Sequence, residues 1–218
     1  MKKKWILLFL ILLSACVRKT DTGNNISQFW KHLQEKEDFY FNLNNNDPDG
    51  WNELYTLLQK ENPGFGFMIG TDIVDGKKDF IITVNADKEL FADVEAFVKK
   101  APELNFLKPV ALIPHMTEIQ PFVVDNVSLT AEKIRVHFDE PVDGKYNLIF
   151  ILPPEHTAQI ANDDTGEYYD AYMQLLYLMT LQVLGEKQMA DKISGGSLYE
   201  ANAVMPSIPL LDLYDALK

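Results

Sequence analysis

The residues of this chain that could perform acid–base or metal chemistry are few and lie far apart. The four histidines are His32, His115, His137 and His156, and none belongs to an HExxH pattern, which would place two zinc-binding imidazoles on one helix face. The sequence also has no glycine-rich phosphate loop, no Gly-x-Ser-x-Gly nucleophile turn and no pair of cysteines. We therefore assign no catalytic, metal-binding or cofactor-binding residue from sequence motifs.

One set of polar residues could still come together in the folded chain. His137 is expected on the non-core face of a strand beside Arg135 and Asp139, and Glu155 and His156 follow the other strand of the same hairpin. A divalent metal site needs three or four converging ligands, so a metal or hydrolase site is one hypothesis. The alternative, which we favour, is a polar sheet face partly covered by a helix.

The only cysteine, Cys16, follows a segment with the features of an export signal. Lys2, Lys3 and Lys4 form a basic start, and residues 5–13 are a run of nine apolar residues. A membrane-spanning helix needs about 20 such residues, so the run predicts a secretory signal rather than a membrane span. A lone cysteine at the end of that signal indicates a role there rather than in a disulfide.

The tetrad Leu13-Ser14-Ala15-Cys16 resembles the bacterial lipobox, in which a diacylglycerol is attached to the cysteine and the signal is cut just before it. The resemblance implies that residues 1–15 are removed and that Cys16 is the lipid-attachment site, which anchors the protein to a membrane. The alternative is an ordinary signal peptide cut after Ala15, with Cys16 left as a free thiol.

The segment after the cysteine predicts a tether and a location. Residues 16–26 comprise the lipidated cysteine and a short polar stretch without apolar periodicity, which is typical of a flexible linker. No acidic cluster follows Cys16, in contrast to many lipoproteins that are exported to the cell surface. We therefore expect a protein anchored to the bacterial cell membrane or outer membrane that faces the periplasm.

The charge of the chain excludes one class of partner. It has 20 basic and 32 acidic residues, and removal of Lys2, Lys3 and Lys4 with the signal leaves 17 against 32, a net charge of −15. Such a surface repels phosphate backbones, so we expect no nucleic-acid binding.

Apolar periodicity outlines the folded body. A spacing of 3.6 residues predicts helices at about residues 27–43, 51–60, 87–101, 164–184 and 210–217. Alternation predicts strands at about residues 65–69, 80–84, 107–114, 134–138, 146–152 and 197–204.

Two Asp-Gly pairs, Asp75-Gly76 and Asp143-Gly144, predict hairpins with two-residue type I′ turns. Placing each pair at the tip sets the register of both hairpins and puts large apolar side chains on one face. The predicted pairs are Ile69 with Ile82, Phe67 with Val84, Phe138 with Ile149 and Val136 with Ile151.

The order of elements predicts an α+β fold, with antiparallel or mixed sheets and helices packed on one face. Residues 27–218 are expected to form a single domain with two halves, 27–115 and 116–218. Each half is ordered hairpin, helix, strand, which permits a ββαβ pseudo-repeat. A true duplication and a coincidence both stay open.

Three further segments share a pattern with other bacterial proteins. Residues 80–114 read FIITVNADKELFADVEAFVKKAPELNFLKPVALIP, and the others are Phe29-Trp30 with residues 35–39 and Leu184-Gly185-Glu186 with residues 192–195. Together they resemble a widespread family of uncharacterised bacterial proteins. Phe106 stands where that family usually has Trp, and His115 stands where Arg is common. The resemblance implies the fold and no activity.

Two functions of different classes follow. The one we favour is a non-enzymatic envelope lipoprotein that binds a protein partner, for example an immunity-type protein that neutralises a basic toxin, because opposite charges speed association. The alternative is an envelope hydrolase that uses residues such as His137, Asp139 and Glu155. A pocket that gathers these side chains would favour the enzyme.

Overall fold

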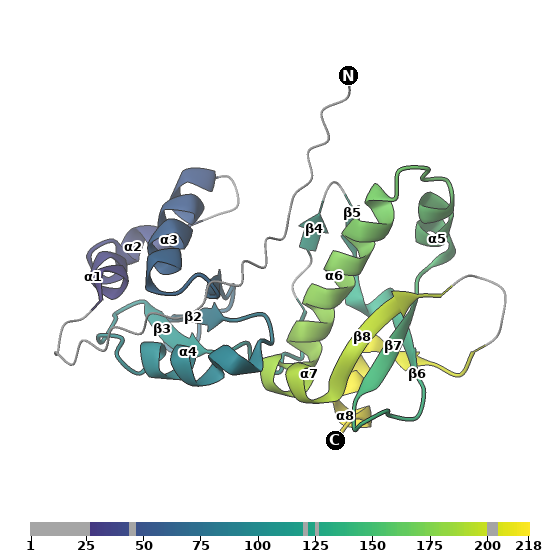
Figure 1. Ribbon diagram of the computed structural model, residues 1–218. Coiled ribbons are helices and arrows are strands. Elements are labelled where there is room, and N and C mark those ends of the chain that lie inside the picture. The colour runs from purple at the N-terminus through teal and green to yellow at the C-terminus, as the bar shows by residue number, and fades with distance from the viewer. Residues whose placement is uncertain (1–26, 44–46, 120–121, 125–126, 200–204) are drawn as a thin grey trace.

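The computed structural model describes residues 27–43, 47–119, 122–124, 127–199 and 205–218 (Figure 1). It contains helices with mixed and antiparallel sheets, which confirms the predicted α+β class. Cys16, the signal and the tether, residues 1–26 in all, lie outside the described residues. Among the helices that are described, none is both long and apolar enough to cross a bilayer.

The first half of the chain builds a three-stranded sheet in the order β1-β2-β3. β1 and β2 are antiparallel, and β2 and β3 are parallel. The strands are β1 (Gly66–Ile69), β2 (Lys78–Thr83) and β3 (Leu107–Ala111). The helices are α1 (Gln28–Glu35), α2 (Glu37–Phe41), α3 (Pro48–Glu61) and α4 (Phe91–Val98), with the 3-10 turn η1 (Lys88–Leu90) before α4.

The second half builds a four-stranded sheet in the order β8-β7-β6-β9 and a separate two-stranded ribbon. The strands are β6 (Arg135–Phe138), β7 (Tyr146–Ile151), β8 (Ile193–Leu198) and β9 (Ile208–Pro209), and the ribbon is β4 (Phe122–Val124) with β5 (Val127–Leu129). The helices are α5 (Pro154–Ala161), α6 (Glu167–Leu184), α7 (Glu186–Lys192) and α8 (Leu213–Ala216), with η2 (Ala131–Lys133) and η3 (Leu210–Asp212).

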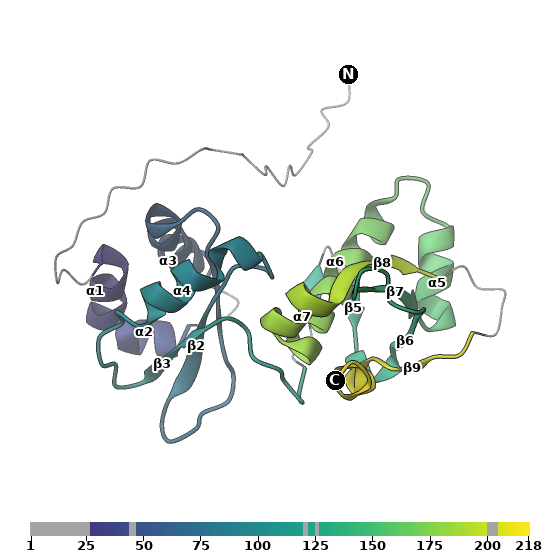
Figure 2. The same cartoon turned by 60° about the horizontal axis from the view of Figure 1, so that its bottom comes forward.

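The buried apolar side chains form two clusters, which define two lobes (Figure 2). In the first lobe, α1, α3 and α4 cover the face of β2 that carries Phe80 and Ile82. In the second lobe, α6 and α8 cover the face of β7 that carries Leu148 and Phe150. Ile81, on the opposite face of β2, packs into the second cluster, so the two lobes share this strand.

Both predicted turns are confirmed. Asp75-Gly76 and Asp143-Gly144 have positive φ at both residues, between 52° and 79°, as a type I′ turn requires. Each turn lies in the same tetrapeptide, Val-Asp-Gly-Lys, at residues 74–77 and 142–145, whose outer residues form a β-bridge.

The register of the first hairpin differs from the prediction by two residues. Phe67 lies opposite Ile82 and Ile69 opposite Phe80, because three residues before the turn bend out of the ladder. A shift of two residues keeps each side chain on its expected face. Ile82 and Val84 are therefore buried, while Phe67 and Ile69 are partly buried against the same cluster.

The register of the second hairpin differs by one residue, which has a larger effect. Val136 lies opposite Phe150, and Phe138 lies opposite Leu148. A one-residue shift turns the return strand over. The core of the second lobe therefore receives Leu148 and Phe150, not the predicted Ile149.

The cause of this shift lies just before the turn. Residues 139–141 face only two residues of the return strand, and Pro141 cannot donate to a ladder. Ile149 and Ile151 consequently lie on the opposite face and are only partly buried. Within its sheet β7 is a central strand, because β6 and β8 flank it.

Two other element predictions need correction. The helix expected over residues 27–43 breaks at Lys36, where φ is −113°. Its first part is capped by Ser27, whose hydroxyl accepts from the amide of Trp30. The last long strand, predicted at about residues 197–204, starts earlier, at Ile193, and runs through Gly195 and Gly196. It pairs in parallel with β7, and residues 200–204 of the predicted strand lie outside the described part.

The two lobes have similar strand connections. In each, a hairpin is followed by helix and then by a strand parallel to the second hairpin strand. The pseudo-repeat itself stays a prediction.

The register of the second hairpin can be tested with two adjacent residues. Leu148→Ala should lower the free energy of unfolding by about 2–5 kcal/mol, because this side chain is fully buried. Ile149→Ala, on the partly exposed face, should cost clearly less. Urea unfolding followed by circular dichroism measures both. A larger loss for Ile149→Ala would support the register expected from the turn alone.

Candidate functional site

The two lobes meet at the short connection between α6 and α7. Gly185 forms this connection with φ 73° and ψ 155°, a conformation that favours glycine. A Cβ atom there would lie 2.7 Å from the amide nitrogen of His115, so the close approach also requires glycine. The amide of Met116 donates to the carbonyl of Gln182 at 2.9 Å. The end of α6 is thereby fixed against the chain that leaves β3.

The carboxylate of Glu186, at the start of α7, is fully buried at this junction. One oxygen accepts from the amides of Val84 and Ala86 at 2.7 and 3.0 Å. The other accepts from the hydroxyl of Thr83 and the amide of Ile113, both at 2.9 Å. Four donors thus satisfy one buried charge, and they come from the ends of β2 and β3.

Surface contacts surround this buried group. The ammonium of Lys187 lies 2.6 Å from the carboxylate of Glu95, and Lys88 pairs with Asp191. These ion pairs are exposed, so each contributes at most about 1 kcal/mol. The buried hydrogen bonds of Glu186 therefore dominate the polar part of the junction.

A second buried carboxylate has the same structural role within the first lobe. Glu37 of α2 is 4% exposed and accepts from three consecutive amides, those of Asn105, Phe106 and Leu107, at 2.5–3.0 Å. These bonds fix the chain that enters β3. Sequence analysis did not identify either glutamate as a structural residue.

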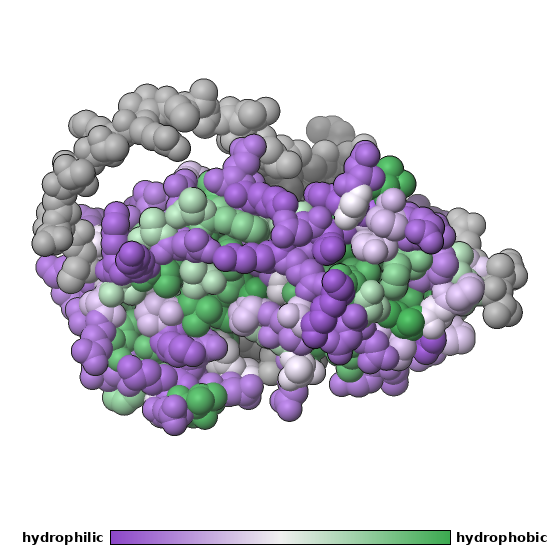
Figure 3. All heavy atoms as spheres, turned by 90° about the horizontal axis from the view of Figure 1, so that it is seen from below, coloured by the Kyte–Doolittle hydropathy of each residue, from purple (hydrophilic) through white to green (hydrophobic). Residues whose placement is uncertain are grey.

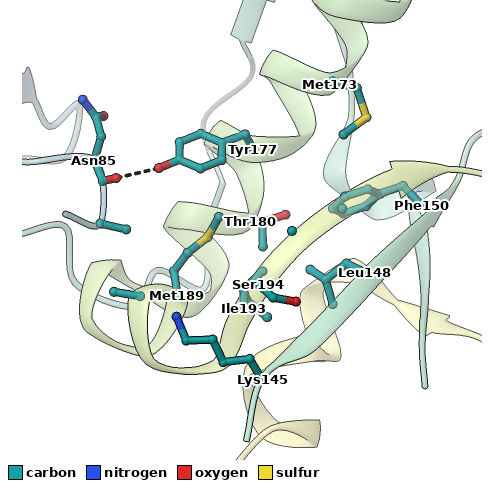
Figure 4. Close-up of a pocket in the computed structure, with 14 residues that line it drawn as sticks. Asn85, Lys145, Leu148, Phe150, Met173, Tyr177, Thr180, Met189, Ile193 and Ser194 are labelled. Atoms are coloured by element: carbon teal, nitrogen blue, oxygen red, sulfur yellow. Dashed lines mark hydrogen bonds between the residues drawn. The ribbon is translucent and has the colours of Figure 1, made fainter. Parts of the chain in front are cut away.

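A pocket of about 290 Å³ lies beside the junction (Figure 4). Its walls come from α6, α7, β7, β8 and the loop after β2, so both lobes contribute. Most of the lining is apolar, and the large apolar side chains are Leu148, Phe150, Met173, Met189 and Ile193. We call this cavity the junction pocket.

The polar side chains of the junction pocket are mostly occupied. The hydroxyl of Tyr177 donates to the carbonyl of Asn85 at 2.7 Å, which joins the two lobes, as Figure 4 shows. Burial, and secondarily the charge of Glu186, raises the pKa of the Tyr177 hydroxyl, so this donor keeps its proton. The one ionisable group of the lining besides Tyr177 is the ammonium of Lys145.

The residues of the hypothetical metal or hydrolase site lie apart from this pocket. His137 contacts Asp139 at 3.0 Å and the carbonyl of Pro206 at 2.6 Å. His156 contacts the hydroxyl of Tyr172 at 2.7 Å, and Glu155 is exposed. In the described ranges, no group of three or more His, Cys, Asp or Glu side chains is placed to hold a metal.

The remaining two histidines have structural contacts. His115 stacks on Tyr214 with ring centroids 3.6 Å apart. His32 lies 2.8 Å from the hydroxyl of Tyr40, which donates to Glu53 at 3.1 Å. Burial and the neighbouring Glu53 raise the pKa of Tyr40 far above its ordinary value. The spacing of these residues along α1–α3 carries no recognisable motif.

The role of Glu186 predicts a large effect of a small change. Glu186→Gln keeps the shape of the side chain but places an amide group against two donors. It should therefore lower the free energy of unfolding by about 2–4 kcal/mol. Chemical denaturation at neutral pH measures the loss. Glu89→Gln, on the exposed surface, is the matched control and should change stability by less than about 0.5 kcal/mol. Equal stability of the two variants would contradict the structural role of Glu186.

Comparisons with protein-family models, with curated proteins and with solved structures find no match for this chain.

Proposed function

We propose that this chain is a lipoprotein of the bacterial envelope whose folded body acts by binding rather than by catalysis. The lipobox-like tetrad ending at Cys16 supports the anchor, and the polar segment after it supports a body tethered close to the membrane. The inner or outer membrane holds the lipid, and the body faces the periplasm.

One observation carries the preference for binding. The junction pocket has a mainly apolar wall and no histidine or carboxylate in its lining, so its chemistry suits retention of a ligand. Of the residues of the hydrolase hypothesis, His137 and Asp139 contact each other outside this pocket, and Glu155 is exposed. General acid–base catalysis needs such groups within hydrogen-bond reach of one reacting atom.

The charge of the body supports a basic protein as partner. No Lys or Arg occurs between Lys145 and Lys187, and this stretch holds six acidic residues. Five of them, all except Glu186, lie at the end of the second lobe formed by α5 and the start of α6. We call this the acidic corner; its members are Glu155, Asp163, Asp164, Glu167 and Asp170.

The acidic corner also carries apolar surface. Tyr168 and Tyr169 are 37% and 41% exposed, and tyrosine is enriched at protein interfaces. Figure 3 shows the opposite face, seen from below Figure 1, where hydrophilic side chains surround several apolar areas. At the acidic corner, attraction between its five carboxylates and a basic partner would guide the encounter, and Tyr168 and Tyr169 would add contact area.

The anchor makes a direct prediction. Cys16→Ala removes the thiol that would receive the lipid, so the protein should lose fatty-acid label and leave the membrane fraction or remain an uncut precursor. Cells labelled with fatty acid are fractionated, and the label and the membrane-bound amount of Cys16→Ala are compared with those of the wild type. Release is expected because anionic headgroups repel a body with a net charge of −15. A wild-type protein that takes up no label would show that Cys16 is not a lipid site.

The proposed partner surface makes a second prediction. A photo-crosslinking residue in place of Tyr169 should capture a basic envelope protein in intact cells. Asp164→Asn, Glu167→Gln and Asp170→Asn together should reduce that adduct about tenfold, because the attraction is electrostatic. Added salt should reduce it in extracts, since screening shortens the range of charge to about 3 Å at 1 M.

The control for this experiment has the same change in charge elsewhere. Glu89→Gln, Glu103→Gln and Glu132→Gln together remove three exposed carboxylates outside the acidic corner. They should leave the adduct at its wild-type level. An adduct that survives neutralisation of the corner, or that falls equally in both triple variants, would contradict the proposed surface.

A further inference from the structure

The junction pocket contains one cationic group that its surroundings leave without a partner. Lys145 lies at the start of β7, after the Asp143-Gly144 turn, and its side chain is partly buried. Figure 4 shows the chain of Lys145 reaching up toward Met189, with the ammonium at the pocket. Within the described ranges, this ammonium has no hydrogen bond or ion pair.

The corresponding lysine of the first hairpin is different. Lys77 follows Asp75-Gly76 in the same Val-Asp-Gly-Lys tetrapeptide, and its ammonium donates to the carbonyl of Leu104 at 2.5 Å. In the first hairpin, the acceptor for the lysine is thus a backbone carbonyl just before β3, the strand parallel to β2. In the second hairpin, the ammonium of Lys145 lies at the pocket and has no such carbonyl as its acceptor.

The hydroxyl groups of the pocket cannot serve as donors to a ligand. Tyr177 donates to Asn85, Thr180 donates to the carbonyl of Leu176, and Ser194 donates to the carbonyl of Tyr146. Lys145 is thus the free cationic donor in the lining. One ammonium can neutralise one negative charge, so the pocket suits a ligand with a single anionic group. A dianion such as a phosphomonoester would require further cations.

The rest of the ligand must be small and apolar. A pocket of about 290 Å³ lies at the lower end of the range found for ligand sites, which suits a small ligand. Its wall includes the ring of Phe150 and the thioethers of Met173 and Met189. Methionine side chains adapt to a ligand and contact aromatic rings favourably.

We propose that the junction pocket binds a small monocarboxylate with an apolar body, best an aromatic ring, and that the carboxylate pairs with Lys145. The ring would lie among Phe150, Met173 and Met189. Because Asn85 and Ala86 of the first lobe also line the pocket, the ligand would touch both lobes and stabilise their junction. This inference is independent of the proposed anchor and of the proposed protein partner.

The test uses hydrocinnamate as the probe and phenylpropanol as its neutral counterpart of similar size. The whole chain is used as purified from its host, in phospholipid nanodiscs if it is membrane-bound, with empty nanodiscs as the blank. Hydrocinnamate should bind saturably with a dissociation constant below about 1 mM, and phenylpropanol about tenfold more weakly. Carbon-labelled methionine methyl groups report the place of binding. Signals of Met173 and Met189 should shift, and that of Met68, in the first sheet, should not.

Variants distinguish the contribution of the Lys145 charge to binding from that of the apolar cavity. Lys145→Gln keeps a long polar side chain and should weaken hydrocinnamate about tenfold while leaving phenylpropanol unchanged. Lys133→Gln, on an exposed lysine, is the matched control and should change neither. The inference is overturned if hydrocinnamate does not saturate, if acid and alcohol bind equally, or if Lys145→Gln leaves hydrocinnamate binding unchanged. Shifts confined to methionines outside the pocket would overturn it as well.

Discussion

The buried carboxylate of Glu186 accepts four hydrogen bonds from segments that lie about 70 to 100 residues earlier in the chain. Burying a charge without such donors is costly, and so is burying amides without an acceptor. The carboxylate of Glu186 and its four donors therefore stabilise each other in the buried junction. Asn85 and Ala86 have positive φ, which costs of order 1–3 kcal/mol each for residues other than glycine. Two hydrogen bonds from this loop to the carboxylate, from Val84 and Ala86, offset that strain.

The junction pocket follows from the same constraint. Glu186 fixes the start of α7 against the loop after β2 and against the end of β3, and the pocket lies beside this contact. The loop and α7 form part of its wall, and α6 and the parallel strands β7 and β8 form the rest. Gly196 faces the ring of Phe150, where a Cβ would lie only 2.7 Å from a ring carbon. The absence of a side chain there lets Phe150 remain in the wall.

The sequence predicted local structure better than long-range contacts. The two Asp-Gly turns were predicted correctly because each depends on a few adjacent residues. The register of the second hairpin was wrong because one extra residue beside Pro141 leaves no signal in the pattern of apolar residues. The junction pocket and the role of Glu186 could not be predicted, since no local pattern relates residues so far apart. The anchor at Cys16 stays a prediction.

The chain order within the two cores has a consequence for how the protein matures. The core of the first lobe is complete once Leu112 has emerged, whether from a ribosome or from an export channel. The second core also needs Leu210, Leu213 and Leu217, at the very end of the chain. A chain that emerges N-terminus first therefore presents every buried residue of the first core while the amides of Val84 and Ala86, in the loop after β2, still lack Glu186 as their acceptor. That loop gains its final acceptor only when α7 arrives, so the earliest-formed lobe is completed by the later one.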